Sequence, residues 1–347
     1  MQAGSDGQAC ASCHFSAGAD PRARNQLSPG LLGGDGVFNP TRTGQLGPNI
    51  AVVAADFPFH VRADPTDRDS PVLFDSDDVM SSEGVFFSVF QAVTPDGLAD
   101  TCEVVADPPF QVDGIDVRRV EPRNSPTVVN AGFNFRNFWD GRANNLFNGV
   151  NPFGRRDPNA FVLEVQGGQV VQRKLEIVNA SLASQAVGPT LSAFEMSCAG
   201  RGFHDVGRKL LADGRRPLAF QKVAPDDSVL GPLADSNTGL STTYAALIQQ
   251  SFAAKLWDST ARFDAAKNLV VDPDAPATFS LMETNFSLFW GLAIAAYERT
   301  LVADDTPFDR YRDGRDPGAL GSGELAGLDV FMGQGKCINC HGTAMFT

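Results

Sequence analysis

The strongest apolar pattern in this chain of 347 residues lies between residues 285 and 302. Apolar side chains cover nearly the whole helical circumference there, including Phe286, Leu288, Phe289, Trp290, Leu292 and Ile294. A helix that is apolar on all sides is normally buried. We therefore predict a buried helix over this range.

Two other segments show apolar residues at helical spacing. Residues 241–257 bring Tyr244, Ile248, Phe252 and Leu256 roughly onto one face, with Ser241 available as a cap. From Ser322 onward, an inner face is formed by Leu325, Leu328 and Phe331. We predict a helix in each segment, and the second leads directly to residue 337.

The rest of the chain is typical of strands and loops. Residues 161–178 hold two apolar runs on either side of Gly167-Gly168, which predicts a β-hairpin. Residues 15–60 are rich in Gly and Pro, and 61–82 are acidic, so we expect loops and solvated surface. The prolines within 272–277 indicate a linker.

Composition limits the classes of partner. The net charge is −13, which makes a nucleic acid an unlikely match and favours attraction of a basic redox protein. Hydrophobic residues make up 43% of the chain, enough for substantial cores, yet no run of 18 apolar residues occurs. We expect a protein without a membrane span.

Two short motifs carry the chemistry. Each has two cysteines separated by two residues and followed by a histidine: Cys10, Cys13 and His14, then Cys337, Cys340 and His341. This is the attachment pattern of haem c, in which both thiols bond to the porphyrin and the histidine binds the iron. A zinc site or a disulfide framework is the alternative, but zinc would need all four thiolates close together. We predict two covalently bound haems.

Covalent haem is attached on the oxidising side of a membrane, so we expect a periplasmic or secreted protein. No signal peptide is visible, and the chain stops six residues after His341, which suggests a mature form or a fragment. Cys102 and Cys198 remain, either as a disulfide or as two buried thiols.

Three further blocks lie between the motifs: RNSPTVVNA at 123–131, FWDGRA at 138–143 and AIAAYERTL at 293–301. In this order they resemble the bacterial di-haem cytochrome c peroxidase superfamily, which includes the MauG-like proteins. The resemblance implies a mainly α fold with two cytochrome c-like haem domains, long loops and a β-hairpin insertion. We expect the first, peroxidatic domain at 1–283 and an incomplete electron-transfer domain at 284–347.

The resemblance also implies roles for single residues. Trp139 matches the tryptophan between the two haems, a relay for electrons, and Asn124 matches a ligand of an interdomain calcium ion. The family's distal glutamine and glutamate would fall at Gly149 and Asn159. However, Gln185 and Glu195 keep the family's neighbouring residues and its spacing of ten, so we expect an insertion of about 36 residues (185 − 149) before them.

A distal glutamate suits peroxide chemistry. Heterolysis needs a group that takes a proton from one oxygen and returns it to the other, and an apolar pocket can raise the pKa of a carboxyl group towards neutrality. We therefore assign Glu195 as the catalytic base, assisted by Gln185; the alternative is that Glu195 caps a helix or lies on the surface.

One departure concerns the sixth ligand of the first haem. Related proteins close this haem with a second histidine, but the matching position is Asp116. His60 and His204 fit surface or packing roles better, although His204 stays a weak candidate. We expect an open first haem. The second haem's sixth ligand would lie beyond the chain end, because Met345 is too close to reach and Met332 fits a core role.

Three functions follow from these predictions. The first is a peroxidase that reduces hydrogen peroxide with electrons from a small c-type cytochrome or a cupredoxin. The second is oxidation of an organic or protein substrate, as in MauG-like proteins or rubber oxygenases. The third is an electron-transfer cytochrome without peroxidase activity. The oligomeric state is open, with a homodimer as one alternative.

Overall fold

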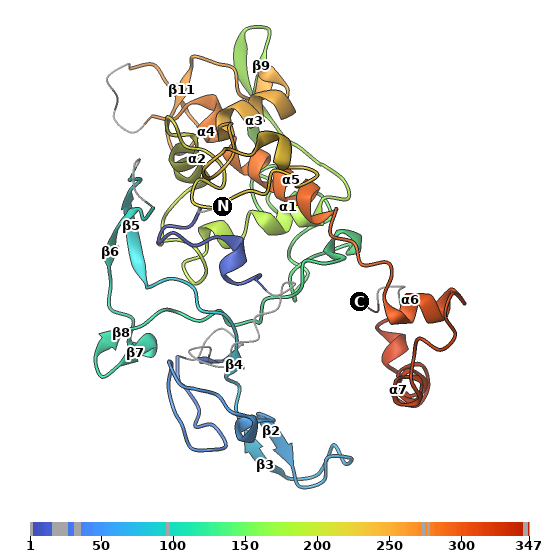
Figure 1. The fold of residues 1–347 in the computed structure, drawn as a ribbon. Helices are drawn as coiled ribbons and strands as arrows, with labels where there is room; N and C mark the ends of the chain where they lie inside the picture. Colours follow the sequence, from blue (N-terminus) through green and yellow to red (C-terminus); the bar gives the residue numbers. More distant parts are fainter. Residues whose placement is uncertain are drawn as a thin grey trace.

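The structure is a computed structural model that describes residues 3–15, 27–30, 36–94, 98–272, 275, 278–342 and 346. Helices α1 to α5 gather in one body beside the N-terminus, while α6 and α7 lie apart from it (Figure 1). The α-helices are α1 Ser181–Ala186, α2 Phe203–Leu211, α3 Tyr244–Ser251, α4 Leu281–Thr284, α5 Phe286–Glu298, α6 Pro307–Arg312 and α7 Ser322–Met332.

The strands form small antiparallel pairs rather than one continuous sheet. The β2–β3 hairpin extends away from the helical body (Figure 1). The pairs are β1 Leu27–Ser28 with β4 Val79–Met80, β2 His60–Arg62 with β3 Val72–Asp75, β5 Ser88–Ala92 with β6 Thr101–Val104, β7 Gln111–Val112 with β8 Ile115–Asp116, β9 Val162–Gln166 with β10 Gln169–Arg173, and β11 Arg262–Phe263 with β12 Leu269–Val270.

The expectation of a mainly α fold is wrong. Only 26% of residues are helical and 16% are in strands. Among the described residues, the first α-helix begins at Ser181. The 34 glycines and 22 prolines help to explain this, because glycine favours turns and proline interrupts helices. The described parts of the long segment before α1 accordingly fold into hairpins, 3-10 turns and loops.

The individual helices and strands agree better with the predictions than the fold class does. The helix predicted at 285–302 is confirmed as α5, but it ends at Glu298 and is buried mainly over Phe286–Gly291. The hairpin is confirmed as β9–β10. The predicted helix at 241–257 is shorter, since α3 ends at Ser251, and its cap is Thr243, whose hydroxyl accepts from the amide of Ala246 at 3.2 Å. The helix expected from Ser322 onward is α7, although its cap is Gly321 and not Ser322 as expected. Much of the predicted linker lies outside the described residues.

The main core forms where α5 crosses α1 and α2. Phe147, Leu182 and Phe289 are almost completely buried in it. Asn285, at the start of α5, is fully buried, and its side-chain amide bonds both the N–H and the carbonyl of Leu163 in β9 (3.0 and 2.7 Å). Because buried amides need such partners, this contact fixes the hairpin against the helix.

Helix α5 therefore shares its core with residues on the N-terminal side of position 283. The division into domains at 1–283 and 284–347 stays a prediction of the sequence. None of the helices in the described part of the chain is long and apolar enough to cross a membrane.

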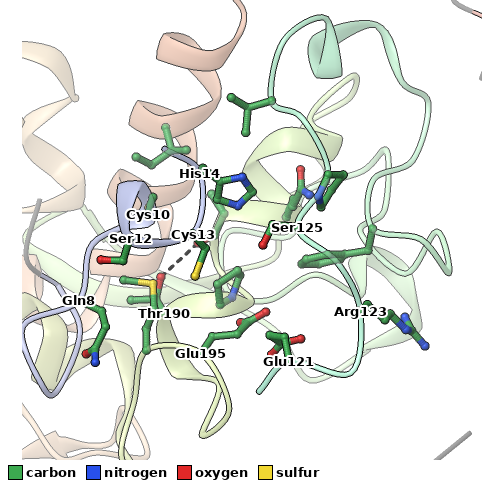
Figure 2. A pocket seen from close by; sticks show the side chains of 18 of the residues that line it. Gln8, Cys10, Ser12, Cys13, His14, Glu121, Arg123, Ser125, Thr190 and Glu195 are labelled. Atoms are coloured by element: carbon green, nitrogen blue, oxygen red, sulfur yellow. Dashed lines mark hydrogen bonds between the residues drawn. The ribbon is translucent and has the colours of Figure 1, made fainter. Parts of the chain in front are cut away.

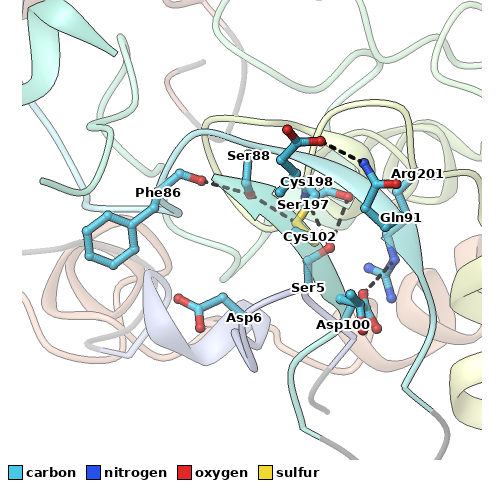
Figure 3. The surroundings of a disulfide bond; sticks show 12 residues. Ser5, Asp6, Phe86, Ser88, Gln91, Asp100, Cys102, Ser197, Cys198 and Arg201 are labelled. Atoms are coloured by element: carbon cyan, nitrogen blue, oxygen red, sulfur yellow. Dashed lines mark hydrogen bonds and ion pairs between the residues drawn. A yellow bond between two sulfur atoms is a disulfide. The ribbon is translucent and has the colours of Figure 1, made fainter. Parts of the chain in front are cut away.

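A cross-linked region holds the N-terminal segment in place. Cys102 of β6 and Cys198 form a disulfide, which resolves the alternative left by the sequence (Figure 3). Beside it, the fully buried carboxylate of Asp100 pairs with Arg201 at 3.0 Å and Lys209 at 3.1 Å. The same two cations donate to the carbonyls of Ala3 and Gly4, so the chain just before Cys10 is tied to α2.

Candidate functional site

The first motif folds into a tight turn at the end of this clamped segment. The 3-10 helix η1 covers Cys10–Ser12, and the amides of Cys13 and His14 both donate to the carbonyl of Cys10 (3.2 and 2.9 Å). The thiol of Cys13 also approaches the carbonyl of Glu83 at 3.7 Å. The turn brings both cysteines and the histidine to one place on the molecule.

That place is the wall of a cavity, with about 1030 Å³ of empty space when the open solvent at its mouth is included. Figure 2 shows the motif on one side and Glu121, Arg123 and Glu195 on another. The apolar part of the wall comes from several elements and consists of Pro126, Val128, Phe138, Trp139, Ala186, Pro189, Met196, Trp290 and Ile294.

The cavity brings together most of the residues that the sequence singled out. Besides the first motif, it is lined by Asn124, Trp139, Gln185 and Glu195. These residues come from positions up to 185 apart (195 − 10) in the chain. Their roles in catalysis or metal binding stay predictions, but their common location is a finding of the structure.

The predicted insertion has a structural counterpart. Hairpin β9–β10 lies between Phe147 and Ser184, where the insertion was expected. Neither Gly149 nor Asn159 lines the cavity. A Cβ at Gly149 would meet Val162 at 2.8 Å, so this position belongs to the packed core. Gln185 and Glu195 occupy the cavity instead.

Two short helices present Gln185 and Glu195. Gln185 lies near the end of α1, and the 3-10 helix η6, Pro189–Leu191, follows it. Gly188 between them is required by space, because a Cβ there would meet the ring of Phe138 at 2.9 Å. The amide of Glu195 donates to the carbonyl of Ser192 at 3.2 Å.

A second carboxyl group, which sequence reasoning missed, lies against Glu195. The side chains of Glu121 and Glu195 are hydrogen-bonded to each other inside the cavity wall. Desolvation by burial raises the pKa of both carboxyl groups, and the neighbouring carboxylate adds to the rise at Glu121. The only sequence signal was a glutamate three positions before Asn124.

Two arginines lie next to this pair. Arg123 and Arg142 both line the cavity, and both bond the carboxylate of Asp140 (2.8 and 2.9 Å). These bonds hold the pKa of Asp140 well below its usual range despite partial desolvation. The arginines therefore provide positive charge at the edge of a largely apolar site.

Trp139 lies between the cavity and the protein surface. Its indole N–H donates to the backbone carbonyl of Asn124 at 2.7 Å, which fixes the ring. The side chain contributes to the cavity wall, but 68% of the residue is exposed. One part of the tryptophan thus faces the cavity while another remains accessible.

Glu298 of α5 also lines the cavity and was missed by sequence reasoning, although it lies within the AIAAYERTL block. Burial raises its pKa to about 7. Cys10 is close enough to feel its charge. A carboxyl group that changes charge near neutrality therefore lies near the attachment motif.

His14 is the only one of the four histidines that lines the cavity. Asp116 lies in β8, where it accepts from the side chain of Gln111 at 2.6 Å, away from the cavity. His60 bonds Asp75 on an exposed hairpin at 3.0 Å. His204 packs on the ring of Phe279, with 4.2 Å between the centroids.

The second motif has different surroundings. Its turn, η9 Cys337–Asn339, follows α7, and His341 is exposed. The Nδ1 of His341 donates to the carbonyl of Phe346 at 2.9 Å, and its ring lies 6.3 Å from Phe331. None of the motif's cysteines or its histidine lines the cavity at the first motif.

A covalently attached haem fits the first site. The only disulfide among the described residues joins Cys102 and Cys198, so the thiols of Cys10 and Cys13 are not consumed by it. His14 adjoins them, and the remaining wall is mostly apolar and aromatic. In this donor set, the residues that would hold the group are Cys10, Cys13 and His14.

Comparisons with known proteins agree with this chemistry. Residues 3–269 match the family model for di-haem cytochrome c peroxidase. Cytochrome c551 peroxidase of Pseudomonas aeruginosa is 27% identical over 63% of this chain and 36% of its own length. Cytochrome c peroxidase Ccp of Escherichia coli is 25% identical over 64% of this chain and 27% of its own.

A shorter alignment has a higher sequence identity. Methylamine utilization protein MauG of Methylorubrum extorquens is 42% identical over 16% of this chain and 15% of its own length. The aligned parts thus span between 15% and 36% of the length of these relatives. No solved structure matches the chain. Because the family model covers well over half of the residues, the chain belongs to the di-haem cytochrome c peroxidase family, whose cofactors are haems c.

Proposed function

We propose that this chain carries the peroxide-reducing site of a di-haem c-type peroxidase. The observation that supports it most is the meeting of the first motif, Gln185 and Glu195 around one cavity. Electrons would come from a small c-type cytochrome or a cupredoxin, and the acidic surface of a chain with net charge −13 suits a basic donor.

The chain's own residues would handle the protons. When bound, the haem supplies the redox-active iron at which peroxide is reduced. Glu195 takes a proton from one peroxide oxygen and returns it to the other, and its raised pKa suits that exchange near neutral pH. The side-chain amide of Gln185, on the same wall, orients the peroxide by hydrogen bonding.

The second motif would be the entry point for electrons. His341, with Cys337 and Cys340, would hold the second haem, and its exposure leaves that haem accessible to a donor protein. Trp139, partly exposed and partly in the cavity wall, would relay electrons to the first site. Covalently attached haem would place the protein in the periplasm or outside the cell.

A calcium ion at Asn124 is the least supported part. The carbonyl of Asn124 is already bonded by Trp139. Among the described residues, no group of three or more His, Cys, Asp or Glu side chains could hold a metal ion. Any calcium would therefore depend on carbonyl, amide or water oxygens.

The test is the peroxide-dependent oxidation of a reduced small cytochrome by the haem-loaded protein. Glu195→Gln should slow it by orders of magnitude, because the amide cannot accept the proton. Glu176→Gln is the matched control, since Glu176 lies on the surface in an ion pair with Arg155. An unchanged rate in Glu195→Gln would refute Glu195 as the base.

A second candidate is oxidation of an organic or protein substrate. The absence of any other histidine from the lining of the first site favours it, because the haem would stay open to ligands. A persistent oxidised state after peroxide addition, without turnover of the cytochrome, would support this function. No reaction with peroxide would leave an electron-transfer cytochrome.

A further inference from the structure

Glu121 is the feature of the cavity that the peroxidase function does not yet use. Its carboxyl group is hydrogen-bonded to that of Glu195, and both groups lie in the wall opposite the first motif (Figure 2). Two carboxylates cannot bond each other without a hydrogen between them. At least one of the two must therefore hold a proton.

A single backbone segment, Ser82–Gly84, fixes both glutamates. The amide of Glu121 donates to the carbonyl of Ser82 at 3.0 Å. Gly84 lies directly against the chain before Glu195, because an added Cβ would come within 1.6 Å of the carbonyl oxygen of Phe194 and 2.9 Å of the Cα of Glu195. Any side chain at Gly84 would thus displace the backbone that carries Glu195.

The same segment contacts the haem motif. Cys13 directs its thiol at the carbonyl of Glu83, 3.7 Å away. Residues 82–84 therefore connect the attachment turn, Glu121 and Glu195 at the level of the backbone. Because the attachment turn, Glu121 and Glu195 all contact residues 82–84, this backbone segment sets the distance between the carboxyl pair and the motif.

The charges around the pair decide which glutamate keeps the proton. Arg142 interacts with both carboxyl groups, whereas Arg123 acts on Glu121, and a side-chain bond from Ser192 favours the ionised form of Glu195. Cys10 is the other titratable neighbour of Glu195, and His14 and Glu298 line the same cavity. The charge of Glu195 and its bond to Glu121 raise the pKa of Glu121, whereas the same bond lowers the pKa of Glu195, so the proton belongs mainly to Glu121.

We propose that Glu121 is a positioning residue, which donates a hydrogen bond from its protonated carboxyl group to Glu195 and thereby aims that base at the peroxide. This inference rests on the proposed function. Reduction of one peroxide to two waters takes two electrons from the donor protein and two protons from solvent. Glu195 moves a proton between the peroxide oxygens, while Glu121 keeps its own proton throughout.

Two substitutions at Glu121 separate positioning from structure. Glu121→Gln keeps the shape and still donates, through its amide, so the rate of the peroxide reaction should stay within about threefold of wild type. Glu121→Ala removes the donor and should lower the rate about 10- to 100-fold, as expected for a lost hydrogen bond to a charged group. In a Glu195→Gln background, Glu121→Ala should have no further effect.

The infrared spectrum provides a readout independent of turnover. The difference spectrum between the wild-type haem protein and Glu121→Gln should contain a protonated-carboxyl band at neutral pH that shifts in D2O, because the carboxyl group of Glu298 contributes equally to both proteins. Glu103→Gln, an exposed control, should retain the band of Glu121. An unchanged band in Glu121→Gln, or a Glu121→Ala variant as fast as wild type, overturns the proposal.

The outcomes also distinguish a failure of this proposal from a failure of the proposed peroxidase function. A wild-type protein that does not react with peroxide refutes the proposed function. A protein that reacts normally but lacks the Glu121 band refutes only the positioning role. If Glu121→Ala does not fold, Glu121→Gln still tests the proposal. A loss of rate of about 10-fold or more in Glu121→Gln would count against it, because the glutamine amide preserves the hydrogen-bond donor.

Discussion

The two haem motifs are locally alike but lie in different environments. In each, a 3-10 turn begins at the first cysteine, and the histidine amide donates to that cysteine's carbonyl at 2.9 Å. His14 belongs to the wall of a large cavity, whereas His341 is exposed and lies beside a small aromatic group formed with Phe331 and Phe346. The turn therefore follows from the motif's own sequence, whereas the cavity depends on the structure around it.

The supporting structure explains this difference. The first motif follows a segment held by a buried ion cluster and a disulfide, and it faces α5 across the cavity. The second follows α7, which has no buried residues. Attachment chemistry needs only the local turn, but proton chemistry needs carboxyl groups brought from distant parts of the chain. The first site alone has them among the described residues.

The largest expected effect separates the chemistry of the two sites. His14→Ala should abolish the reaction of the protein with peroxide, a loss of several orders of magnitude, because the iron loses its protein ligand next to Glu195. His341→Ala should retain an initial peroxide reaction but lose turnover with a reduced donor. Rapid-mixing spectroscopy measures both, and equal losses in the two variants would contradict the division of roles.

Removing one buried charge should destabilise the first region selectively. Asp100→Ala leaves Arg201 and Lys209 buried without their carboxylate, which should cost about 3–5 kcal/mol of unfolding free energy. Asp305→Ala is the control near the second motif, where Asp305 pairs with two exposed arginines, and we expect little measurable change. Denaturant unfolding compares them; similar destabilisation would show that both regions depend on ion pairs alike.

Glycine substitutions should have opposite signs in the two regions. At Gly291 in α5, a Cβ would meet Phe147 at 2.8 Å and the carbonyl of Ala183 at 2.9 Å, so Gly291→Ala should destabilise by about 1–3 kcal/mol. At Gly327 in α7 nothing lies within 4 Å, so Gly327→Ala should stabilise the helix by about 0.5–1 kcal/mol. Thermal unfolding tests both substitutions. An unchanged melting temperature in Gly291→Ala would mean that Phe147 and the backbone at Ala183 can shift to accept the extra methyl group.

Another small expected effect is a pH dependence of stability at Glu298. Burial raises its pKa in the folded protein to about 7, above its ordinary value, so its stabilising contribution is complete at low pH and is lost as pH rises through 7. Glu298→Gln should therefore gain stability relative to wild type between pH 5 and 9, by about 1 kcal/mol because the side chain is only partly buried. A constant difference in melting temperature across this range would contradict the shift.

Sequence reasoning was most reliable where the signal was local or periodic. The apolar run predicted α5, and the apolar strands around Gly167-Gly168 predicted β9–β10. It failed for the overall fold class, because family resemblance was extended to the long segment before Ser181, where turn-forming residues give short strands instead. It also placed the cap of α3 at Ser241, although the hydroxyl two residues later has the required geometry.

The candidate site shows the same limit. Shared spacing and neighbouring residues pointed to Gln185 and Glu195, and both line the cavity. Glu121 carried no comparable signal, because its importance lies in a contact with a residue 74 positions away (195 − 121). Likewise, no local pattern could tell whether Cys102 pairs with Cys198 across 96 residues.

The sequence by itself determined the chemistry that can be attached to this protein: two identical turns, each able to hold a haem through two thiols and a histidine. The tertiary structure decided where that chemistry can be used. It placed Glu121 and Glu195 on one backbone support beside the first motif, and it left the second motif exposed. The physical reason is that covalent attachment depends on neighbours in the chain, whereas proton transfer depends on neighbours in space.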